Sequence, residues 1–374
     1  MKKLLIATDS FLPRWDGISR FLTELIPALS EKYDVTVIAP DFPGNKVNTK
    51  AKIVRIPLSW IRIGDYTFPK RKKKIIRKHL KEADLVFSQT IGPIGRNTIN
   101  CAEKMGLPVA CYIHSIEWEL ASGSISRPYL SFIIKKIVKF TAKKAYDKAN
   151  LILVPSKEVK RIFEKEGIGA DKKVVYLGIN PEKFLPAKNK KDAKTRIGIN
   201  PSNLVIGFHG RIGREKDLMT LYNSFNKLAR ENRNIRLLIV GSGLSQQETL
   251  FRSSPNVKYV RSTDQVIDFL QAIDIYVLPS LTETTSLSTL EAMSCGCAVL
   301  ATRVGLVKKY IKDRVNGSFF PAGNEHVLYL KMKWLADNPA IRNSMGYNAR
   351  DTILRRFNWK KTGTEIEKAL ESLL

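Results

Sequence analysis

Acidic side chains are in short supply in this sequence. Its 374 residues include 63 Lys and Arg but 35 Asp and Glu, which gives a formal net charge of +28 and a pI near 9.9. An excess of positive charge this large attracts polyanions, whether nucleic acid, an acidic membrane or phosphorylated ligands. The charge by itself does not choose among these three classes of partner.

Cysteine is rarer still, with four residues in the whole chain. So few cysteines in a chain of this length predict no disulfide framework and favour a reducing compartment such as the cytoplasm. Cys295 and Cys297 are close enough in sequence to suggest a metal site, but neither a His nor a second Cys pair lies near them. We therefore expect both to be small buried residues at a helix end, and we expect no bound metal.

Long apolar runs are also missing. No run approaches the ~18 residues needed to cross a bilayer. The first residues, MKKLLIATDSF, contain one short apolar segment, Leu4–Ala7, which is shorter than the ~7–15 apolar residues of a secretory signal. We therefore expect a first β-strand here.

Short apolar runs, by contrast, recur along the chain, and most are followed by a helical pattern. Continuous runs of Val, Ile and Leu predict strands that are buried on both faces, and their alternation with helices predicts parallel sheets. The predicted strands lie at 4–8, 35–39, 53–57, 85–88, 109–114, 151–155, 174–177, 204–208, 237–240, 257–260, 275–278 and 299–301.

A polar stretch at 186–195 has no apolar period and divides these strands into two groups, so we interpret it as a linker. The pattern predicts an α/β protein with two Rossmann-like, doubly wound parallel-sheet domains that face a central cleft. We place the N-terminal domain at 1–185 and the C-terminal domain at 186–355. A last helical segment, 356–374, can belong to either domain.

Ligands of such sheets bind at the carboxyl ends of the strands, so the residues after each strand are candidates for a site. The predicted strand at 204–208 is followed by HGRIGREKD. Gly210 allows a close backbone approach, and Arg211 and Lys216 carry charges that bind phosphate oxygens. The spacing is not that of a P-loop. A diphosphate site and a solvated basic turn both remain open.

The predicted strand at 275–278 is followed by PSLTETTSLSTLEAMSCG, with glutamates at 283 and 291. A helix that begins near Thr285 has free N–H groups that favour an anion by roughly 0.3–1 kcal/mol. Eight helical positions separate the carboxylates by up to ~12 Å, more than the ~5–9.5 Å of a glycosidase pair. We predict that Glu283 and Glu291 bind two parts of one hydroxyl-rich ligand. The alternative is two solvated glutamates beside an ordinary helix.

These residues resemble the signature of the retaining glycosyltransferases of family 4, which have the GT-B fold and use nucleotide-sugar donors. Glu283 and Glu291 match the family's E-x7-E pattern, and Arg211 and Lys216 match its donor-diphosphate pair. The resemblance spans nearly the whole chain. It implies that Glu283 contacts the donor sugar and that Glu291 contacts the nucleotide ribose.

The same resemblance implies the rest of the site. The loop that ends at Gly17 would lie near the transferred sugar and the acceptor, and His114 would lie beside the reacting sugar. The implied catalytic residues are His114, Glu283, Arg211 and Lys216. The implied donor-binding residues are Gly17, Gly210, Arg211, Lys216, Glu283, Ser286, Leu287, Ser288 and Glu291. The family usually has a glycine where Ser286 stands, so the backbone there must avoid a positive φ or be strained.

The function that this resemblance implies is retaining transfer of a hexose from a nucleoside-diphosphate sugar to a hydroxyl of a glycan or lipid acceptor. Cationic side chains would stabilise the leaving diphosphate, so we expect no metal and no other cofactor. A nucleotide-sugar epimerase and a non-catalytic sugar-nucleotide-binding homologue remain alternatives. A nucleic-acid-binding protein would explain the charge, but the chain has no recognition motif for nucleic acid, and we expect no such partner.

Two segments, 69–81 and 128–144, concentrate positive charge in the N-terminal half. The second predicts a helix with a broad apolar face and lysines opposite. Basic amphipathic helices lie on anionic membranes, so we predict a cytoplasmic enzyme that is peripheral on the inner face of the cell membrane. The alternative is a pair of ordinary helices that bury an apolar face and solvate the other.

Overall fold

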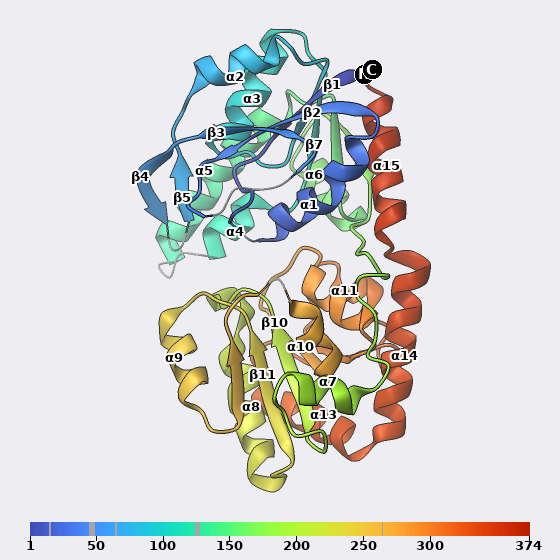
Figure 1. Cartoon of the computed structure of the whole chain (residues 1–374). Helices are drawn as coiled ribbons and strands as arrows, with labels where there is room; N and C mark the ends of the chain where they lie inside the picture. Colours follow the sequence, from blue (N-terminus) through green and yellow to red (C-terminus); the bar gives the residue numbers. More distant parts are fainter. Residues whose placement is uncertain (15, 45–48, 64–65, 124–127, 264) are drawn as a thin grey trace. The chain divides into compact units, whose positions relative to one another are not determined.

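The computed structural model describes residues 1–14, 16–44, 49–63, 66–123, 128–263 and 265–374 (Figure 1). The chain forms two compact units. The first comprises Met1–Tyr176 together with Thr362–Leu374, and the second comprises Leu177–Lys361. The polar segment at 186–195 lies inside the second unit, where Lys190–Arg196 forms helix α7.

The first unit is built on a seven-stranded parallel sheet with the strand order β3-β2-β1-β6-β7-β8-β9. A two-stranded antiparallel hairpin, β4–β5, is separate from this sheet. The strands are β1 (Lys2–Ala7), β2 (Tyr33–Pro40), β3 (Lys52–Ile56), β4 (Leu58–Ile63), β5 (Tyr66–Pro69), β6 (Leu85–Ser88), β7 (Val109–Tyr112), β8 (Leu151–Val154) and β9 (Asp171–Val174). The helices are α1 (Gly17–Leu29), α2 (Lys73–Leu80), α3 (Pro93–Lys104), α4 (Glu117–Gly123), α5 (Pro128–Tyr146) and α6 (Lys157–Lys165).

The second unit is built on a six-stranded parallel sheet with the order β12-β11-β10-β13-β14-β15. Its strands are β10 (Leu204–His209), β11 (Ile235–Val240), β12 (Val257–Val260), β13 (Ile275–Leu278), β14 (Ala298–Ala301) and β15 (Ser318–Phe319). Besides α7, its helices are the 3-10 turn η1 (Arg214–Lys216), α8 (Leu218–Glu231), α9 (Ser245–Ser253), α10 (Val266–Ala272), α11 (Leu287–Ser294), α12 (Val307–Tyr310), α13 (Glu325–Asp337) and α14 (Pro339–Arg356).

The last helix, α15 (Trp359–Glu371), begins among residues of the second unit, and from Thr362 onward its residues belong to the first. Its buried residues include Ile366 and Leu370. Lys32 of the first unit forms ion pairs with Glu367 and, at 3.0 Å, with Glu371.

The predicted α/β class and parallel sheets are confirmed in both units. The continuous apolar runs form the central strands because helices cover both faces of each sheet, and β6, β7, β13 and β14 are buried along their whole length. In both sheets the strand order reverses beside the first strand, between β1 and β6 and between β10 and β13. Such a switch point is where open α/β sheets bind ligands.

The strand predicted at 174–177 is the main error in the sheet assignments. The strand β9 runs over Asp171–Val174, a DKKV segment with exposed side chains at every second position. It lies at the edge of its sheet, where charged residues are common because they discourage pairing with other chains. Such a strand has no apolar run by which to find it.

The four cysteines are free and buried, which confirms the prediction that Cys295 and Cys297 are small buried residues. Cys295 ends α11, and the Cys297 thiol contacts the carbonyl oxygens of Leu270 and Ile273 at 3.4 Å each. Burial raises the pKa of the Cys297 thiol to about 11. Both thiols are therefore protonated core groups near neutral pH. Of the helices described, none combines the length and the apolar character needed to span a bilayer.

Candidate functional site

The switch point of the second unit brings two predicted site segments together. The loop after β10 carries Lys216, and the loop after β13 carries Glu283. Their side chains form an ion pair, and the hydroxyl of Ser280 donates a hydrogen bond to the same Glu283 oxygen at 3.1 Å. We call this the Lys216–Glu283 pair. Its side chains are 17% and 10% exposed, so solvent screens the pair less than it would a surface contact.

The two loops are also joined through their backbones. The N–H of Leu281 donates to the carbonyl oxygen of Glu215 at 2.8 Å, so the segments on either side of the pair are held in register. Lys216 ends the short 3-10 turn η1, where the next residue, Asp217, has a φ of +47°. An ammonium has three N–H donors, so Lys216 can hold Glu283 and an anionic ligand at once.

Arg211 lies in the same loop but is more exposed. Its guanidinium donates to the Glu215 carboxylate at 2.6 Å, and its side chain is 49% exposed. Exposed ion pairs contribute little, about 0–1 kcal/mol, so an incoming phosphate can replace Glu215 at small cost. The structure therefore places one of the two predicted cations in a mostly buried pair and the other half-exposed.

Two glycines in the loop after β11 are required by close backbone contact. A Cβ added at Gly241 would overlap the carbonyl oxygen of Gly210, and one at Gly243 would overlap that of Ile212. The N–H groups of Gly210 and Ile212 donate to the carbonyl oxygens of Val240, which ends β11, and Ser242, in the loop after it, at 2.9 Å each. Gly210 also has a φ of +147°, which favours glycine. The loop after β10 is therefore braced by the next strand's loop.

Of the two alternatives for the backbone at Ser286, which precedes α11, the structure has the strained one. Ser286 has φ +56° and ψ +76°, in the left-handed region, which costs a residue with a Cβ roughly 1–2 kcal/mol. Its hydroxyl contacts that of Thr289 at 2.8 Å. Within the described part of the chain, the N–H groups of Leu287 and Ser288 have no acceptor. Such free N–H groups at a helix start suit an anion.

The loop that leads into α11 is supported from behind. A Cβ at Gly305 would overlap the carbonyl oxygen of Glu283, and the N–H of Leu306 donates to Thr284 O at 2.7 Å. The hydroxyl of Tyr310 donates to Thr285 O at 2.9 Å. These contacts fix the backbone that carries Glu283. They also fix the direction in which α11 begins.

Glu291 is set deeper than Glu283. Its side chain is fully buried in α11, and its Oε2 lies 2.7 Å from Nε2 of His209, the last residue of β10. The predicted contact of Glu291 with a ribose stays a prediction. Each glutamate of the pattern has its own basic partner, which fits two separate binding groups better than an acid and base acting together.

His209 was missed by the sequence analysis, although it directly precedes Gly210. Nothing in the local sequence marks it, because its partner is 82 positions away in the chain. The contact depends on β10 and β13 being neighbours in the sheet, which the local sequence does not show.

In the first unit, Gly17 opens α1 after the loop that follows β1. Asp16 caps this helix by accepting hydrogen bonds from the N–H groups of Ile18 and Ser19 at 3.0 Å each. A Cβ added at Gly17 would meet no described atom within 4 Å. Packing inside this unit therefore does not require a glycine there, unlike Gly305 in the second unit.

His114 follows β7, as predicted, and is enclosed by apolar rings. Phe21 and Tyr112 lie 4.8 and 4.9 Å from it between ring centroids, and its Nε2 is 3.0 Å from Oε1 of Gln89. Because an amide oxygen only accepts, this contact puts the proton on Nε2. Burial lowers the pKa of His114 to about 3. His114 is therefore a neutral hydrogen-bonding group near pH 7 and a poor general base.

Asp9 is a second residue that the sequence analysis missed. It follows β1, is 5% exposed, and accepts hydrogen bonds from Thr90 Oγ1 at 2.5 Å and from the N–H groups of Ile94 and Gly95 at 2.7 and 3.1 Å. Burial raises its pKa against the pull of these hydrogen bonds. Asp9 ties the loop after β1 to the start of α3 across the switch point of the first unit.

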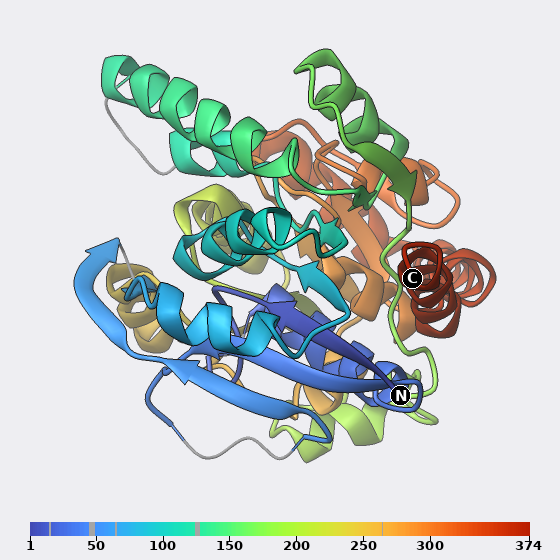
Figure 2. The ribbon, with the colours of Figure 1, turned by 90° about the horizontal axis from the view of Figure 1, so that it is seen from above.

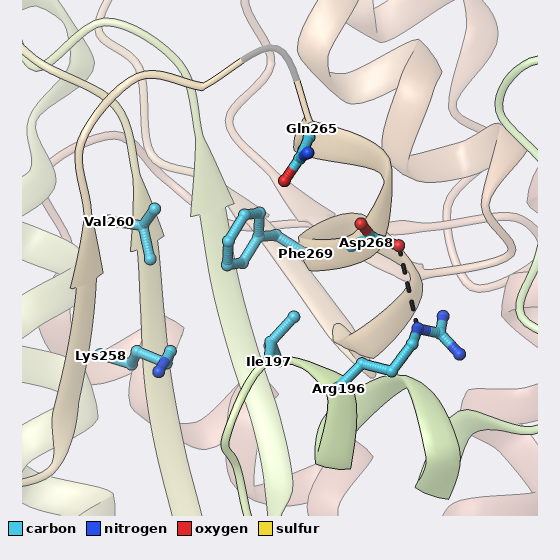
Figure 3. Close-up of a pocket in the computed structure, with 7 residues that line it drawn as sticks. All are labelled: Arg196, Ile197, Lys258, Val260, Gln265, Asp268 and Phe269. Carbon is cyan, nitrogen blue, oxygen red and sulfur yellow. Dashed lines mark ion pairs between the residues drawn. The ribbon is translucent and has the colours of Figure 1, made fainter.

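A separate pocket in the second unit holds none of these residues (Figure 3). It has a volume of about 330 Å³ and is formed by α7, β12 and α10. Arg196 reaches across its rim toward Asp268, with 3.9 Å between the charged atoms. The lining residues are Arg196, Ile197, Lys258, Val260, Gln265, Asp268 and Phe269. It lies at the edge strand β12, away from the switch point.

Family models match both halves of the chain. The model described as glycosyl transferases group 1 matches residues 189–352, and the one described as glycosyltransferase family 4 matches residues 15–183. The first match lies within the second unit, and the second match lies in the first unit except for residues 177–183.

Curated relatives share low identity with the chain. The capsular polysaccharide biosynthesis glycosyltransferase CapM of Staphylococcus aureus is 24% identical over 71% of each chain. The alpha-monoglucosyldiacylglycerol synthase of Acholeplasma laidlawii is 22% identical over 92% of this chain and 90% of that protein. A D-inositol 3-phosphate glycosyltransferase of Streptomyces bingchenggensis is 29% identical, but the match covers 50% of this chain and less than half, 45%, of that protein.

Solved structures show the fold. Sucrose-phosphate synthase from Thermosynechococcus elongatus superposes with a TM-score of 0.78 at 16% identity, covering 100% of this chain and 99% of that one. Anabaena HepE in complex with UDP superposes equally well, at 17% identity over 100% of both chains. The chain therefore has the GT-B fold and belongs to the glycosyltransferases that these two family models describe.

Proposed function

We propose that this glycosyltransferase moves a hexose, with retention of configuration and without a metal ion, from a nucleoside-diphosphate sugar to a hydroxyl of a lipid or glycan. The observation that carries the proposal is the Lys216–Glu283 pair beside the start of α11. It combines a cation and free N–H groups for a diphosphate with a carboxylate for sugar hydroxyls.

The diphosphate is the part of the donor that most needs positive charge. Lys216 keeps Glu283 with one N–H and offers the others to phosphate oxygens, while Arg211 exchanges Glu215 for the same ligand. The N–H groups of Leu287 and Ser288 complete the cradle. These groups act on the charge that develops as the bond from the anomeric carbon to the phosphate oxygen breaks. That is the work a metal ion does in other transferases.

Two carboxylates then hold the neutral parts of the donor. Glu283 accepts hydrogen bonds from hydroxyls of the transferred sugar, and Glu291, which His209 orients, accepts from the ribose. In the transfer step the acceptor oxygen forms its bond to the anomeric carbon, and its proton passes to the leaving phosphate oxygen. This route needs no protein base, which fits a pKa of about 3 for His114.

The first unit is proposed to carry the acceptor. With its Nε2 proton directed at Gln89, neutral His114 can accept one hydrogen bond from the reacting sugar at Nδ1, and the space beside Gly17, which no described atom fills within 4 Å, admits a ligand against the start of α1. One relative, the alpha-monoglucosyldiacylglycerol synthase of Acholeplasma laidlawii, is named for a glycolipid product. A lipid or lipid-linked acceptor is therefore the first class to test.

The donor is best tested with UDP-sugars first, because Anabaena HepE has been solved with UDP-glucose. We expect UDP-glucose or another UDP- or GDP-sugar to raise the melting temperature of the chain. Lys216→Ala should keep the fold but lower transfer by ~100-fold or more. Lys188→Ala, an exposed lysine of the same unit, is the matched control and should leave transfer unchanged.

Two outcomes would contradict the proposal. Unchanged turnover in Lys216→Ala would remove the role of the Lys216–Glu283 pair. Sugar isomerisation without release of a nucleoside diphosphate would favour an epimerase, and donor binding with no turnover on any lipid or glycan acceptor would favour a non-catalytic binding protein.

A further inference from the structure

The two basic segments of the first unit differ in whether their apolar side chains are buried or exposed. In α2, Ile76 and Leu80 are buried while the basic residues face solvent, which is the ordinary pattern of a surface helix. In α5 the prediction of lysines opposite an apolar face is wrong. Apolar side chains lie on both sides of the helix, because its buried side, with Ala142 and Tyr146, is apolar as well.

The outer side of α5 is unusually apolar. Tyr129, Phe132, Ile137 and Phe140 are 79%, 56%, 57% and 69% exposed. Single exposed apolar residues are common, but a continuous row along one helix marks an interaction surface. These positions, with Lys136 and Lys144, recur at helical spacing over about four turns, ~22 Å. We call this row the α5 face.

The charge of the α5 face is entirely positive. The 19 residues of α5 include five lysines and no acidic residue. Carboxylates of neighbouring segments form ion pairs with three of them, Lys135, Lys139 and Lys143. In the described chain no carboxylate pairs with Lys136 or Lys144, and the ammonium of Lys136 lies over the Phe132 ring at 4.6 Å.

This charge pattern selects among the partners that an exposed apolar row could have. A second copy of the chain would bring lysines against lysines, which is repulsive. An anionic bilayer takes aromatic rings at the headgroup level and lysines among its phosphates. The chain as a whole carries a net charge of +28, which adds to this attraction.

A second element of the first unit carries the same combination. Trp60 of β4 is 91% exposed, and the hairpin that holds it leads into the exposed basic run at 70–74. Figure 2 shows the N-terminal end of α5 and the β4–β5 hairpin projecting from the same side of the first unit. Trp is well suited to an interface, since its ring is apolar and its N–H is polar.

We infer that the α5 face docks on the headgroup region of an anionic membrane, with Phe132 and Phe140 inserted and Lys136 and Lys144 against lipid phosphates. The helix lies in the plane of the interface and does not cross the bilayer. The inference rests on the proposed lipid acceptor for its purpose, since it would bring the first unit to the surface where such an acceptor lies.

Flotation of the full chain with vesicles tests the inference. We expect binding to phosphatidylcholine vesicles that contain phosphatidylglycerol, and little binding to phosphatidylcholine alone. Phe132→Ser/Phe140→Ser should weaken binding at least ~10-fold. The control, Tyr347→Ser/Leu354→Ser on α14, changes two exposed apolar side chains of the second unit and should bind as the wild type does.

The charge is tested separately. Each lysine near an anionic surface strengthens binding by a factor of about five, so Lys136→Glu/Lys144→Glu should weaken it at least ~10-fold. Lys188→Glu/Lys191→Glu makes the same change in net charge on exposed lysines of the second unit. Equal losses in the two variants would mean that total charge drives binding, and the inference would be wrong.

Three further results separate the remaining cases. Full binding by Phe132→Ser/Phe140→Ser overturns the inference, and so does a concentration-dependent dimer, seen by sedimentation, that this variant abolishes. Donor-induced thermal shifts should persist in every α5 variant. If the wild type floats but neither binds nor consumes a nucleotide sugar, the docking stands and the proposed function fails.

Discussion

The two units have the same strand order around their switch points but place opposite kinds of chemistry there. In the second unit the loops after β10 and β13 meet through the charged Lys216–Glu283 pair. In the first unit the loops after β1 and β6 meet through Asp9, which accepts hydrogen bonds from groups of its own unit, and the nearby histidine is neutral. Topology decides where a site can form, and the loop residues decide what it binds.

The largest expected effect comes from removing a charge from the Lys216–Glu283 pair at the switch point of the second unit. Glu283→Gln keeps the shape of the side chain but removes the charge that faces Lys216, and we expect transfer to fall at least ~100-fold. The double variant Lys216→Ala/Glu283→Gln should lose little more than either single variant, because groups that act as one unit are not additive. Steady-state transfer rates measure both.

Glu215→Gln is the matched control for that change. Its carboxylate pairs with exposed Arg211 in the same loop, so we expect less than a threefold loss, the scale of an exposed ion pair. If the fold-losses in transfer rate of the two single variants multiply in Lys216→Ala/Glu283→Gln, Lys216 and Glu283 act independently.

In the first unit, the comparison can be sharpened by measuring how stability depends on pH, because a buried carboxyl group there has a raised pKa. Glu117 of α4 accepts a hydrogen bond from Tyr146 at 2.5 Å, and burial raises the pKa of its carboxyl to about 7. The unfolded chain loses this proton near pH 4.5 and the folded chain near pH 7, so stability should fall as the pH rises between these values. Glu117→Gln should remove this dependence and stabilise the protein at pH 8 by about 2–3 kcal/mol.

Urea unfolding at pH 5 and pH 8 measures that effect. The wild type and Glu117→Gln should have similar stability at pH 5 and should diverge at pH 8. Glu119→Gln on the same helix, whose carboxylate is half-exposed, is the control. A wild type that is equally stable at both pH values would contradict the raised pKa.

The switch point of the first unit should respond to mutation through folding rather than through the donor. Asp9→Ala leaves three donors without their acceptor, so the free energy of unfolding should fall by about 2 kcal/mol. The thermal shift produced by a nucleotide sugar should stay, since the donor residues lie in the second unit. Asp34→Ala, exposed on β2, is the control. Loss of donor binding at unchanged stability would contradict this assignment.

The smallest expected effect concerns the strained residue before α11. Ser286→Gly removes the Cβ from a left-handed backbone and should raise the free energy of unfolding by about 0.5–1 kcal/mol. Glycine elsewhere destabilises because it loses more backbone entropy on folding, so the sign of the change is informative. Ser288→Gly, inside the helix, should destabilise. A destabilising Ser286→Gly would contradict the positive φ.

Much of the fold was readable from the sequence because the central strands are continuous apolar runs. The same rule found the edge strands β3 and β12 but failed at the opposite edges, where β9 is a DKKV segment and β15 has two residues. The hairpin β4–β5 was also missed, since Trp60, Ile61 and Arg62 are exposed and it joins neither large sheet. A run rich in apolar residues is the signal, and a strand without such a run is not found.

The site was readable in part. Position after a strand identified Lys216 and Glu283, but not their contact, because the adjacency of β10 and β13 is a property of the sheet. His209 and Asp9 were missed for the same reason, since their partners lie 82 and 81 positions away. The outer row of α5 was misjudged because a helix that is apolar on both sides has no single face to find by periodicity.

The division of the chain at Thr362 has a consequence for synthesis on the ribosome. Residues 1–176 emerge first, yet the unit that they form also includes 362–374, with Ile366 and Leu370 in its interior and Glu367 against Lys32. The second unit is contiguous and can fold while translation continues. The unit that is made first is therefore the last to be completed. A nascent chain stalled before residue 362 should expose to chaperones the apolar surface against which α15 packs.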